Sequence, residues 1–307
     1  MTRHQTLPPA LEGDLRETNR RAGRLAYQVA GNGPPMLLIH SINAAASAYE
    51  VLPIFDRMKS SHRVYVVELP GYGHSDRSDR SYDIRLFTNA ILDMLDVIAE
   101  DAGPGTPVDA LALSLSAEFV ARAAVERPER FRTLTLVTPT GFSKGSTKAH
   151  GGIRTKASRE VPGVYRAISF PLWGRGLYDL LVSRRSIRYF LERTWGSKNI
   201  DDGMVDYDYL TSHQPGARHA PFAFLSGRLF SRDIRDLYER LTLPVWMPHG
   251  TRGDFKDFSG VDFIENRPNW RRQAFDAGAL VHFEWPDDFA ASYRAFLTEM
   301  ARQEVAV

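Results

Sequence analysis

Short apolar runs alternate with segments of helical periodicity along the first half of the chain. Residues 24–30 alternate apolar and polar positions like a half-buried strand, and four later runs are typical of strands buried on both faces: 36–40, 64–69, 108–113 and 132–137. Between them, the spacing of apolar residues predicts helices over 47–59, over 84–100, and from Glu118 to about Arg127. This order predicts an α/β fold with a mainly parallel, doubly wound sheet.

The alternation breaks after Gly141. From residue 143 to about residue 241 no buried strand is evident, and aromatic-rich helical segments such as IRYFLERTW take its place. The strand–helix order resumes at residues 244–247, residues 280–283 are expected to end the last strand or to follow it, and residues 287–302 have the pattern of an amphipathic helix. We therefore predict one α/β core, residues 1–142 and 243–307, split by a helical insertion over residues 143–242.

Composition and charge narrow the class of protein. The 307 residues carry a net charge of only +2, so nothing indicates a nucleic-acid partner, and the basic stretch RRSIRYFLER is interpreted as a solvated helix face. The chain has no cysteine, which excludes disulfides, thiolate metal sites and cysteine nucleophiles. The N-terminal residues lack the apolar segment of a secretory signal, and no apolar run reaches the roughly 20 residues of a membrane span. We expect a cytoplasmic protein with no membrane partner, and its oligomeric state stays unknown.

Ser114 stands at the point where a strand pattern changes into a helix pattern. A sharp strand-to-helix turn needs small residues two positions before and after its apex, and here these are Ala112 and Ser116. Ser116 fails the same test, because Glu118 would lie at its own +2 position. Ser114 is either a nucleophile held at a strained turn or one more small turn residue, and the strand–turn–helix context leaves both interpretations open.

Three further segments, taken together with the Ser114 motif, match the pattern of one protein family. GRLAYQVAGNGPPMLLIHS, ELPGYGHSDR and LPVWMPHGTRGDF, with the closing segment HFEWPDDFAASYRAFL, are in the order and positions found in α/β-hydrolases that carry a helical cap. The chain resembles that group on both sides of the insertion, with Ser41 in place of a glycine and Glu68 in place of an aspartate. The resemblance implies the α/β-hydrolase fold, with residues 143–242 as the cap, or lid, over the active site.

The resemblance also implies a set of site residues. Ser114 would be the nucleophile, His282 its base, and Asp254 the carboxylate that orients the histidine. The backbone amides of Ile42 and Leu115 would form the oxyanion hole. No cofactor and no metal are expected.

The base is the part of this assignment that has alternatives. Members of the family usually show Gly-His in the segment where this chain has Gly278-Ala279, and His282 follows three residues later, 28 residues after Asp254. His282 is the favoured base, and the alternatives are a site with no conventional base and a site that uses another histidine. Asp254 is favoured over Asp257 because it follows its strand at nearly the usual distance.

The expected activity is that of a cofactor-independent serine hydrolase, carboxylesterase-like, acting on a small to medium apolar carboxylic ester or lactone. Serine at the turn argues against the dehalogenases and epoxide hydrolases of the family, which have aspartate there. One alternative is a carbon–carbon bond hydrolase, which an arginine facing Ser114 would favour; another is a non-catalytic ligand-binding homologue, which Ala279 leaves open. Aromatic residues of the insertion could line an apolar pocket, although most are expected to form the insertion's own core: Phe170, Trp173, Tyr178, Tyr189, Phe190, Trp195, Tyr207, Tyr209, Phe222 and Phe224.

Overall fold

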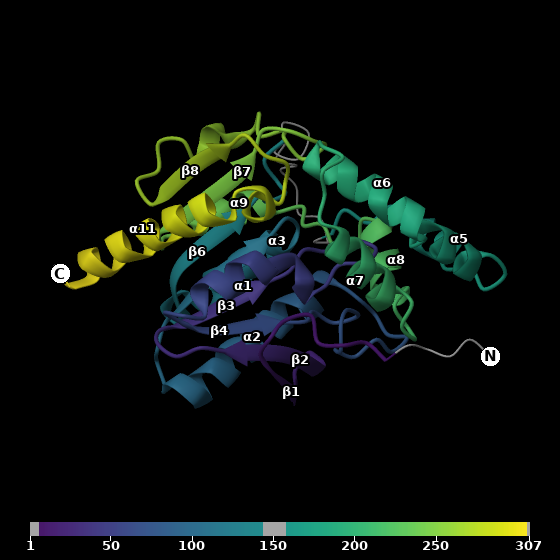
Figure 1. Cartoon of the computed structure of the whole chain (residues 1–307), viewed down its shortest axis with the longest axis horizontal. Helices are drawn as coiled ribbons and strands as arrows, with labels where there is room; N and C mark the ends of the chain where they lie inside the picture. Colours follow the sequence, from purple (N-terminus) through teal and green to yellow (C-terminus); the bar gives the residue numbers. More distant parts are fainter. Residues whose placement is uncertain (1–5, 144–157, 306–307) are drawn as a thin grey trace.

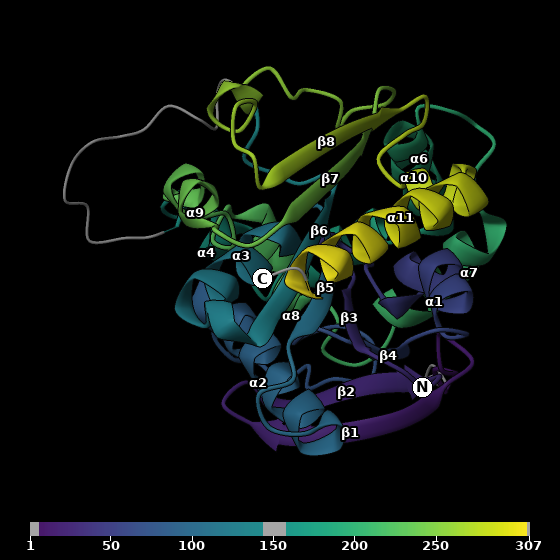
Figure 2. The same cartoon turned by 90° about the vertical axis from the view of Figure 1, so that its left-hand side faces the viewer.

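The computed structural model describes residues 6–143 and 158–305, which form a central eight-stranded sheet in the order β1-β2-β4-β3-β5-β6-β7-β8 (Figures 1 and 2). The strands from β4 to β8 in this order pair in parallel, whereas β1 and β2 pair antiparallel at one edge. The predicted α/β-hydrolase fold, with its mainly parallel sheet, is confirmed. The strands are β1 (Asp14–Arg20), β2 (Gly23–Ala30), β3 (Pro35–Ile39), β4 (Arg63–Val67), β5 (Val108–Leu113), β6 (Phe131–Val137), β7 (Val245–Gly250) and β8 (Trp270–Phe275).

Helices cover both faces of the sheet (Figure 2). On one face α2 packs against α3 and α3 against α9, and on the other α11 packs against α1 and α10. The helices are α1 (Leu52–Met58), α2 (Ile84–Ala102), α3 (Ser116–Glu126), α4 (Val164–Ile168), α5 (Gly174–Leu181), α6 (Arg184–Trp195), α7 (Asp202–Ser212), α8 (His219–Leu225), α9 (Ile234–Arg240), α10 (Val281–Glu284) and α11 (Pro286–Val305), with 3-10 turns η1 (Ala48–Val51), η2 (Pro128–Arg130) and η3 (Val261–Phe263).

Strand β3 shows why the central strands are continuous apolar runs. All five of its residues are buried; Met36 and Leu38 join the core under α1 and α11, and Leu37 and Ile39 join the core under α2 and α3. A strand between two helical layers has no solvent face, so both sets of alternate side chains must be apolar.

The sequence pattern did not predict the two outermost strands, β1 and β8. β1 has the sequence DLRETNR and no buried residue, and β8 has the sequence WRRQAF and is at most half-buried, so neither has an apolar pattern. Of the two alternatives for residues 280–283, the end of the last strand was wrong, because β8 stops at Phe275; the segment follows β8, as expected of the second alternative, but it enters the short helix α10 (Val281–Glu284) instead of forming a loop. An edge strand is held by backbone pairing on one side only, which leaves its side-chain pattern weakly constrained.

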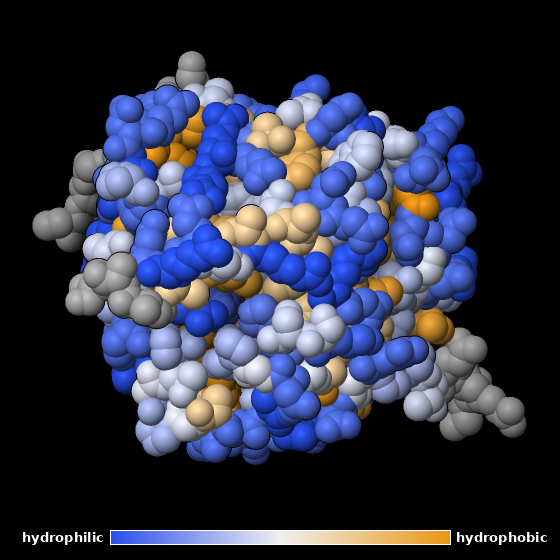
Figure 3. Space-filling model, turned by 60° about the vertical axis from the view of Figure 1, so that its left-hand side comes forward, coloured by the Kyte–Doolittle hydropathy of each residue, from blue (hydrophilic) through white to orange (hydrophobic). Residues whose placement is uncertain are grey.

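Helices α4 to α9 lie between β6 and β7 in the chain, and Figure 1 shows α5 to α8 together on one side of the sheet. Helix α9 differs from the others because it packs on α3, with Ile234, Leu237 and Tyr238 buried. Part of the predicted insertion, residues 144–157, lies outside the described residues, and the division of the chain at residues 142 and 243 stays a prediction. On the face shown in Figure 3, polar residues cover most of the surface and the apolar ones lie mainly in small groups.

Candidate active site

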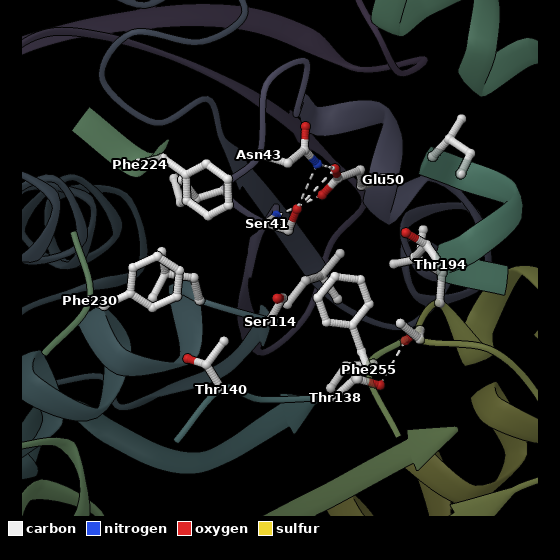
Figure 4. Close-up of a pocket in the computed structure, with 17 residues that line it drawn as sticks. Ser41, Asn43, Glu50, Ser114, Thr138, Thr140, Thr194, Phe224, Phe230 and Phe255 are labelled. Atoms are coloured by element: carbon white, nitrogen blue, oxygen red, sulfur yellow. Dashed lines mark hydrogen bonds between the residues drawn. The ribbon is translucent and has the colours of Figure 1, made fainter. Parts of the chain in front are cut away.

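Ser114 lies at the turn between β5 and α3 with a φ of 51°, a backbone conformation that few residues other than glycine adopt. The turn is fixed from both sides, because the Ser114 amide donates to the Val137 carbonyl over 3.0 Å and the Ser114 carbonyl accepts from the Ala117 amide over 3.2 Å. Within the described part of the chain the Ser114 hydroxyl has no hydrogen-bond partner, and it faces a cavity (Figure 4). A strained turn that presents an unpaired hydroxyl is the arrangement of a nucleophile elbow.

Ser116 has a different environment. It is fully buried, and its hydroxyl donates to the His40 carbonyl at the end of β3 over 2.6 Å. Ala112, the other small residue of the motif, is also fully buried. Of the two serines, Ser114 therefore faces the cavity and Ser116 ties α3 to the neighbouring strand.

The cavity above Ser114 has a volume of about 130 Å³ and is mainly apolar. Its floor comes from the loops that follow β3, β5 and β6, and its walls come from α6, from α8 and from the loop before α10. Figure 4 shows Phe224, Phe230 and Phe255 around the serine. Among the described lining residues, Glu50 carries the one ionisable side chain.

Ile42 and Leu115 both line this cavity, as expected of the residues whose amides would bind an oxyanion. Neither backbone N–H donates a hydrogen bond to another described residue. Both side chains are buried in the apolar core under α2 and α3, which holds the peptide groups in place. Two fixed, unpaired N–H groups beside a serine are the donors that a tetrahedral oxyanion requires.

Glu50 accepts a network of hydrogen bonds at the cavity wall (Figure 4). One carboxylate oxygen accepts from the Ser41 amide over 2.7 Å, and the other accepts from the Ser41 hydroxyl over 3.0 Å and from the Asn43 side-chain amide over 2.8 Å. Sequence analysis missed this group, because Glu50 looks like an acidic residue in the first turn of a surface helix. Ser41 in place of the family's glycine is the sequence signal that could have indicated it.

The environment of Glu50 changes its acidity. Glu50 is 3% exposed, and burial raises the pKa of its carboxyl group from 4.5 to about 7, although the hydrogen bonds from Ser41 and Asn43 oppose the shift. Near neutral pH the group is thus divided between its protonated and ionised forms, which suits it to accept and return a proton.

His282 does not lie at this cavity. Its ring is fully buried, and Nε2 donates to the backbone carbonyl of Glu50 over 2.7 Å, while Nδ1 has no partner among the described residues. Burial lowers the pKa of His282 to about 4, so the ring is neutral at pH 7. This placement does not support the predicted role of base for Ser114: the imidazole instead holds the backbone of Glu50.

Ala279 lies where the resemblance places the family's histidine. It lines the Ser114 cavity, its carbonyl accepts from the Thr138 hydroxyl over 2.7 Å, and its amide donates to the Thr194 carbonyl over 2.9 Å. The loop before α10 is thus held against β6 and α6 with a methyl group in the position of the imidazole.

Asp254 is also separate from Ser114. Its carboxylate pairs with the guanidinium of Arg193 on α6 over 2.5 and 2.9 Å, and both side chains are about half exposed. Asp254 lines a second cavity, described below, and makes no hydrogen bond to His282. Its rival Asp257 accepts from the Ser259 amide over 3.0 Å and does not line the Ser114 cavity. The structure thus brings together Ser114, Ile42 and Leu115, and leaves His282 and Asp254 outside their cavity.

Other described histidines do not replace the missing base. His40 is fully buried, donates from Nδ1 to the Ser41 carbonyl over 2.7 Å and accepts from the Leu69 amide over 3.0 Å. His249 hydrogen-bonds to the Gly250 carbonyl and His213 to the Tyr209 carbonyl. None of the three lines the Ser114 cavity.

The ten aromatic residues that the sequence analysis named in the insertion differ in burial and in position. Tyr178, Trp195, Tyr207 and Phe222 are buried and belong to the core, while Phe170, Trp173, Tyr189 and Phe190 are about half exposed. Phe224, like Phe230, lines the Ser114 cavity, and Tyr209 packs against the ring of His213. In the described ranges 6–143 and 158–305, no group of three or more metal-binding side chains is arranged to hold an ion, and no helix has the length and apolarity of a membrane span.

Comparison with known proteins agrees with the fold. A family model described as the alpha/beta hydrolase fold matches residues 34–178, which include the turn. The chain has the α/β-hydrolase fold. An uncharacterized protein of Mycobacterium tuberculosis strain H37Rv is 26% identical to this chain over 121 residues, which are 39% of the chain and 33% of that relative. The match thus spans about a third of the relative's length.

Several solved structures share this fold over most of the chain. A probable hydrolytic enzyme from Pseudomonas aeruginosa PAO1 is 17% identical, with a TM-score of 0.72 over 95% of this chain and 96% of that one. A 2-hydroxy-6-oxo-6-phenylhexa-2,4-dienoate hydrolase from Rhodococcus sp. strain RHA1 is 16% identical, with a TM-score of 0.70 over 93% and 99% of the two chains. An epoxide hydrolase is 18% identical, with a TM-score of 0.71 over 94% and 100%. These similarities establish the fold and leave the substrate open.

Proposed function

We propose that this α/β-hydrolase cleaves a small to medium, largely apolar carboxylic ester or lactone, with Ser114 as the nucleophile. The observation that carries the proposal is the Ser114 turn: a residue at φ 51° whose unpaired hydroxyl faces an apolar cavity beside the unpaired amides of Ile42 and Leu115. We further propose Glu50 as the proton acceptor, because it is the one ionisable group among the described lining residues.

The chemical steps balance with these groups. Ser114 Oγ attacks the acyl carbon, and its proton passes to the Glu50 carboxylate, either directly or through the hydroxyl of Ser41. The amides of Ile42 and Leu115 hold the carbonyl oxygen as it becomes negative. The leaving alkoxide takes the proton from Glu50. A water molecule then attacks the acyl carbon and gives a proton to Glu50, and the bond to Ser114 Oγ breaks as Oγ takes that proton back, which releases the acid.

His282 is a positioning residue in this scheme. Its Nε2–H fixes the carbonyl of Glu50, at the start of the 3-10 turn that carries the carboxyl group to the cavity. The scheme replaces the predicted Ser114–His282–Asp254 relay, because the His282 ring is turned to the Glu50 backbone and Asp254 is paired with Arg193.

The two serines provide the test. In Ser114→Ala, hydrolysis of p-nitrophenyl butyrate should fall at least about 10³-fold with little change in Tm, because the hydroxyl has no structural partner. Ser116→Ala is the matched control and should keep most of the activity. A fluorophosphonate probe should label wild-type protein at Ser114, with the labelled peptide identified by mass spectrometry. An active Ser114→Ala variant would contradict the proposal.

A second candidate function has its own supporting observation. Ala279 places a methyl group where the family has its base, so a chain that binds a small apolar ligand without hydrolysing it is the competing interpretation. Folded wild-type protein that resists the fluorophosphonate probe and hydrolyses no ester would favour binding. The carbon–carbon hydrolase alternative has less support, because no arginine is among the described residues that line the Ser114 cavity.

A further inference from the structure

A second cavity of about 320 Å³ adjoins the first. The two share five lining residues: Asn43, Leu191, Thr194, Phe224 and Phe255. Its remaining walls are largely apolar and include Phe190 of α6. A molecule whose acyl group lies at Ser114 could therefore extend into this space.

Asp208 of α7 is the unexplained polar group of this second cavity. It is 3% exposed, its Oδ1 atom is buried without a partner, and neither oxygen makes a hydrogen bond to another described residue. A buried carboxyl group without partners is costly, and proteins rarely keep one unless a ligand or a function compensates for it.

The groups around Asp208 favour a cation as the binding partner of its carboxyl group. Burial, and then the neighbouring carboxyl groups of Glu50 and Asp201, raise the pKa of Asp208 well above its ordinary value, so a positive charge beside the group would favour its ionised form. Arg193 lines the same cavity, but its guanidinium is already paired with Asp254. No described basic side chain is hydrogen-bonded to Asp208.

We propose that Asp208 binds a protonated amine on the substrate, in the second cavity and at the end of the molecule opposite the ester that Ser114 attacks. The ammonium N–H groups would donate to the carboxylate, while the faces of Phe190 and Phe224 offer the π-surfaces that favour a cation. The assignment of the amine to an ester substrate rests on the proposed function, and the binding site itself does not.

The test compares two probes of equal size, 4-phenylbutylamine and 4-phenylbutanol, by calorimetry with the full chain carrying Ser114→Ala. Because the nucleophile is absent, the result is independent of hydrolysis. The amine should bind at least about 10-fold more tightly than the alcohol. Adding Asp208→Asn, which keeps the shape and removes the charge, should abolish the difference. Asp206→Asn is the matched control, because Asp206 is an exposed residue of the same helix paired with Arg184 and should leave the preference unchanged.

Two results would overturn the assignment. Equal binding of amine and alcohol in the Ser114→Ala background would mean that Asp208 does not select a cation. A preference for the amine that survives Asp208→Asn would place the cation elsewhere. Loss of ester turnover in Ser114→Ala without any preference for the amine would support the proposed function and reject the amine site. A preference for the amine together with an active Ser114→Ala variant would support the amine site and reject the proposed function.

Discussion

At the scale of single residues, two buried carboxyl groups line the two cavities in different settings. Glu50 is surrounded by donors from Ser41 and Asn43, which favour its ionised form, whereas Asp208 has none. Burial opposes ionisation in both. The difference predicts that Glu50 titrates near neutral pH as part of catalysis, while Asp208 stays protonated until a ligand supplies the partner.

The pH dependence of hydrolysis follows from Glu50. A base must be ionised to accept the Ser114 proton, so kcat/KM should rise with pH through an apparent pKa of about 7. Glu50→Gln cannot accept the proton and should lose at least about 10²-fold in kcat/KM across the profile. Tm measurements would separate this loss from unfolding. A Glu50→Gln variant with wild-type kcat/KM would remove Glu50 from the mechanism.

Asp208 should affect stability in the opposite way from a typical aspartate. The folded protein holds a proton on Asp208 that the unfolded chain releases near pH 4, so raising the pH favours the unfolded state. Asp208→Asn removes this penalty and should raise Tm at pH 7, with a gain that shrinks as the pH falls toward 4. The exposed Asp206→Asn variant should show no such trend. A lower Tm for Asp208→Asn at pH 7 would indicate a partner that the described residues do not reveal.

At the scale of elements, the segment from β8 to α10 determines which histidine the site can use. The loop is fixed by Thr138 and Thr194, which hold Ala279 at the cavity, and the following helix turns His282 toward η1. The methyl group of Ala279 therefore lines the cavity where the family has its histidine, and the imidazole of His282 lies outside the cavity.

Substitutions in this segment distinguish positioning from proton transfer. His282→Ala leaves the Glu50 carbonyl unpaired and should cost about 1–3 kcal/mol of stability. Because the Glu50 backbone is then no longer held, His282→Ala should also lower ester turnover. His282→Gln can still donate to that carbonyl, so its turnover should lie closer to that of the wild type. If His282 were the base, both variants would lose about 10³-fold, as Ser114→Ala does.

Ala279→His tests the vacant position from the other direction. An imidazole at residue 279 would enter the Ser114 cavity, and we expect it to raise fluorophosphonate labelling of Ser114 about 10-fold. Ala279→Gln is the control of similar size that cannot accept the proton. Equal labelling in both variants would show that bulk at residue 279, rather than a base, controls the serine.

At the scale of the whole molecule, the site is built where helices between β6 and β7 meet the sheet. Thr194 and Trp195, at the end of α6, contact the loop before α10 and α10 itself. The Thr194 carbonyl accepts from the Ala279 amide of the loop, and the Trp195 ring packs against Phe283 of α10 with ring centroids 5.7 Å apart. Helix α8 contributes Phe224 to both cavities. These contacts connect substrate binding to the packing of helices far from Ser114 in the sequence.

The aromatic residues of these helices should therefore differ in effect. Trp195→Ala removes a buried ring and should lower stability by about 3–5 kcal/mol, measured by denaturant unfolding. Phe224→Ala enlarges both cavities and should shift the preferred chain length of p-nitrophenyl esters upward with a smaller loss of stability. Trp173, about half exposed and outside both cavities, is the control, and Trp173→Ala should leave the preference unchanged.

The sequence by itself determined the features that depend on local pattern. Strands such as β3 are apolar on both sides because two helical layers cover them, and this burial is visible as an uninterrupted run. The Ser114 turn was predictable because the small residues Ala112 and Ser116 flank it between a strand pattern and a helix pattern. The edge strands β1 and β8 left no such pattern.

Only the tertiary structure decided which side chains meet. Arg193 pairs with Asp254 across 61 positions, and His282 reaches the Glu50 carbonyl across 232. Such partners depend on how packed elements orient their side chains, which neither periodicity nor spacing encodes. The burial that raises the pKa of Glu50 and Asp208 has the same origin, because a carboxyl group is identical in sequence whether it faces water or the wall of a cavity.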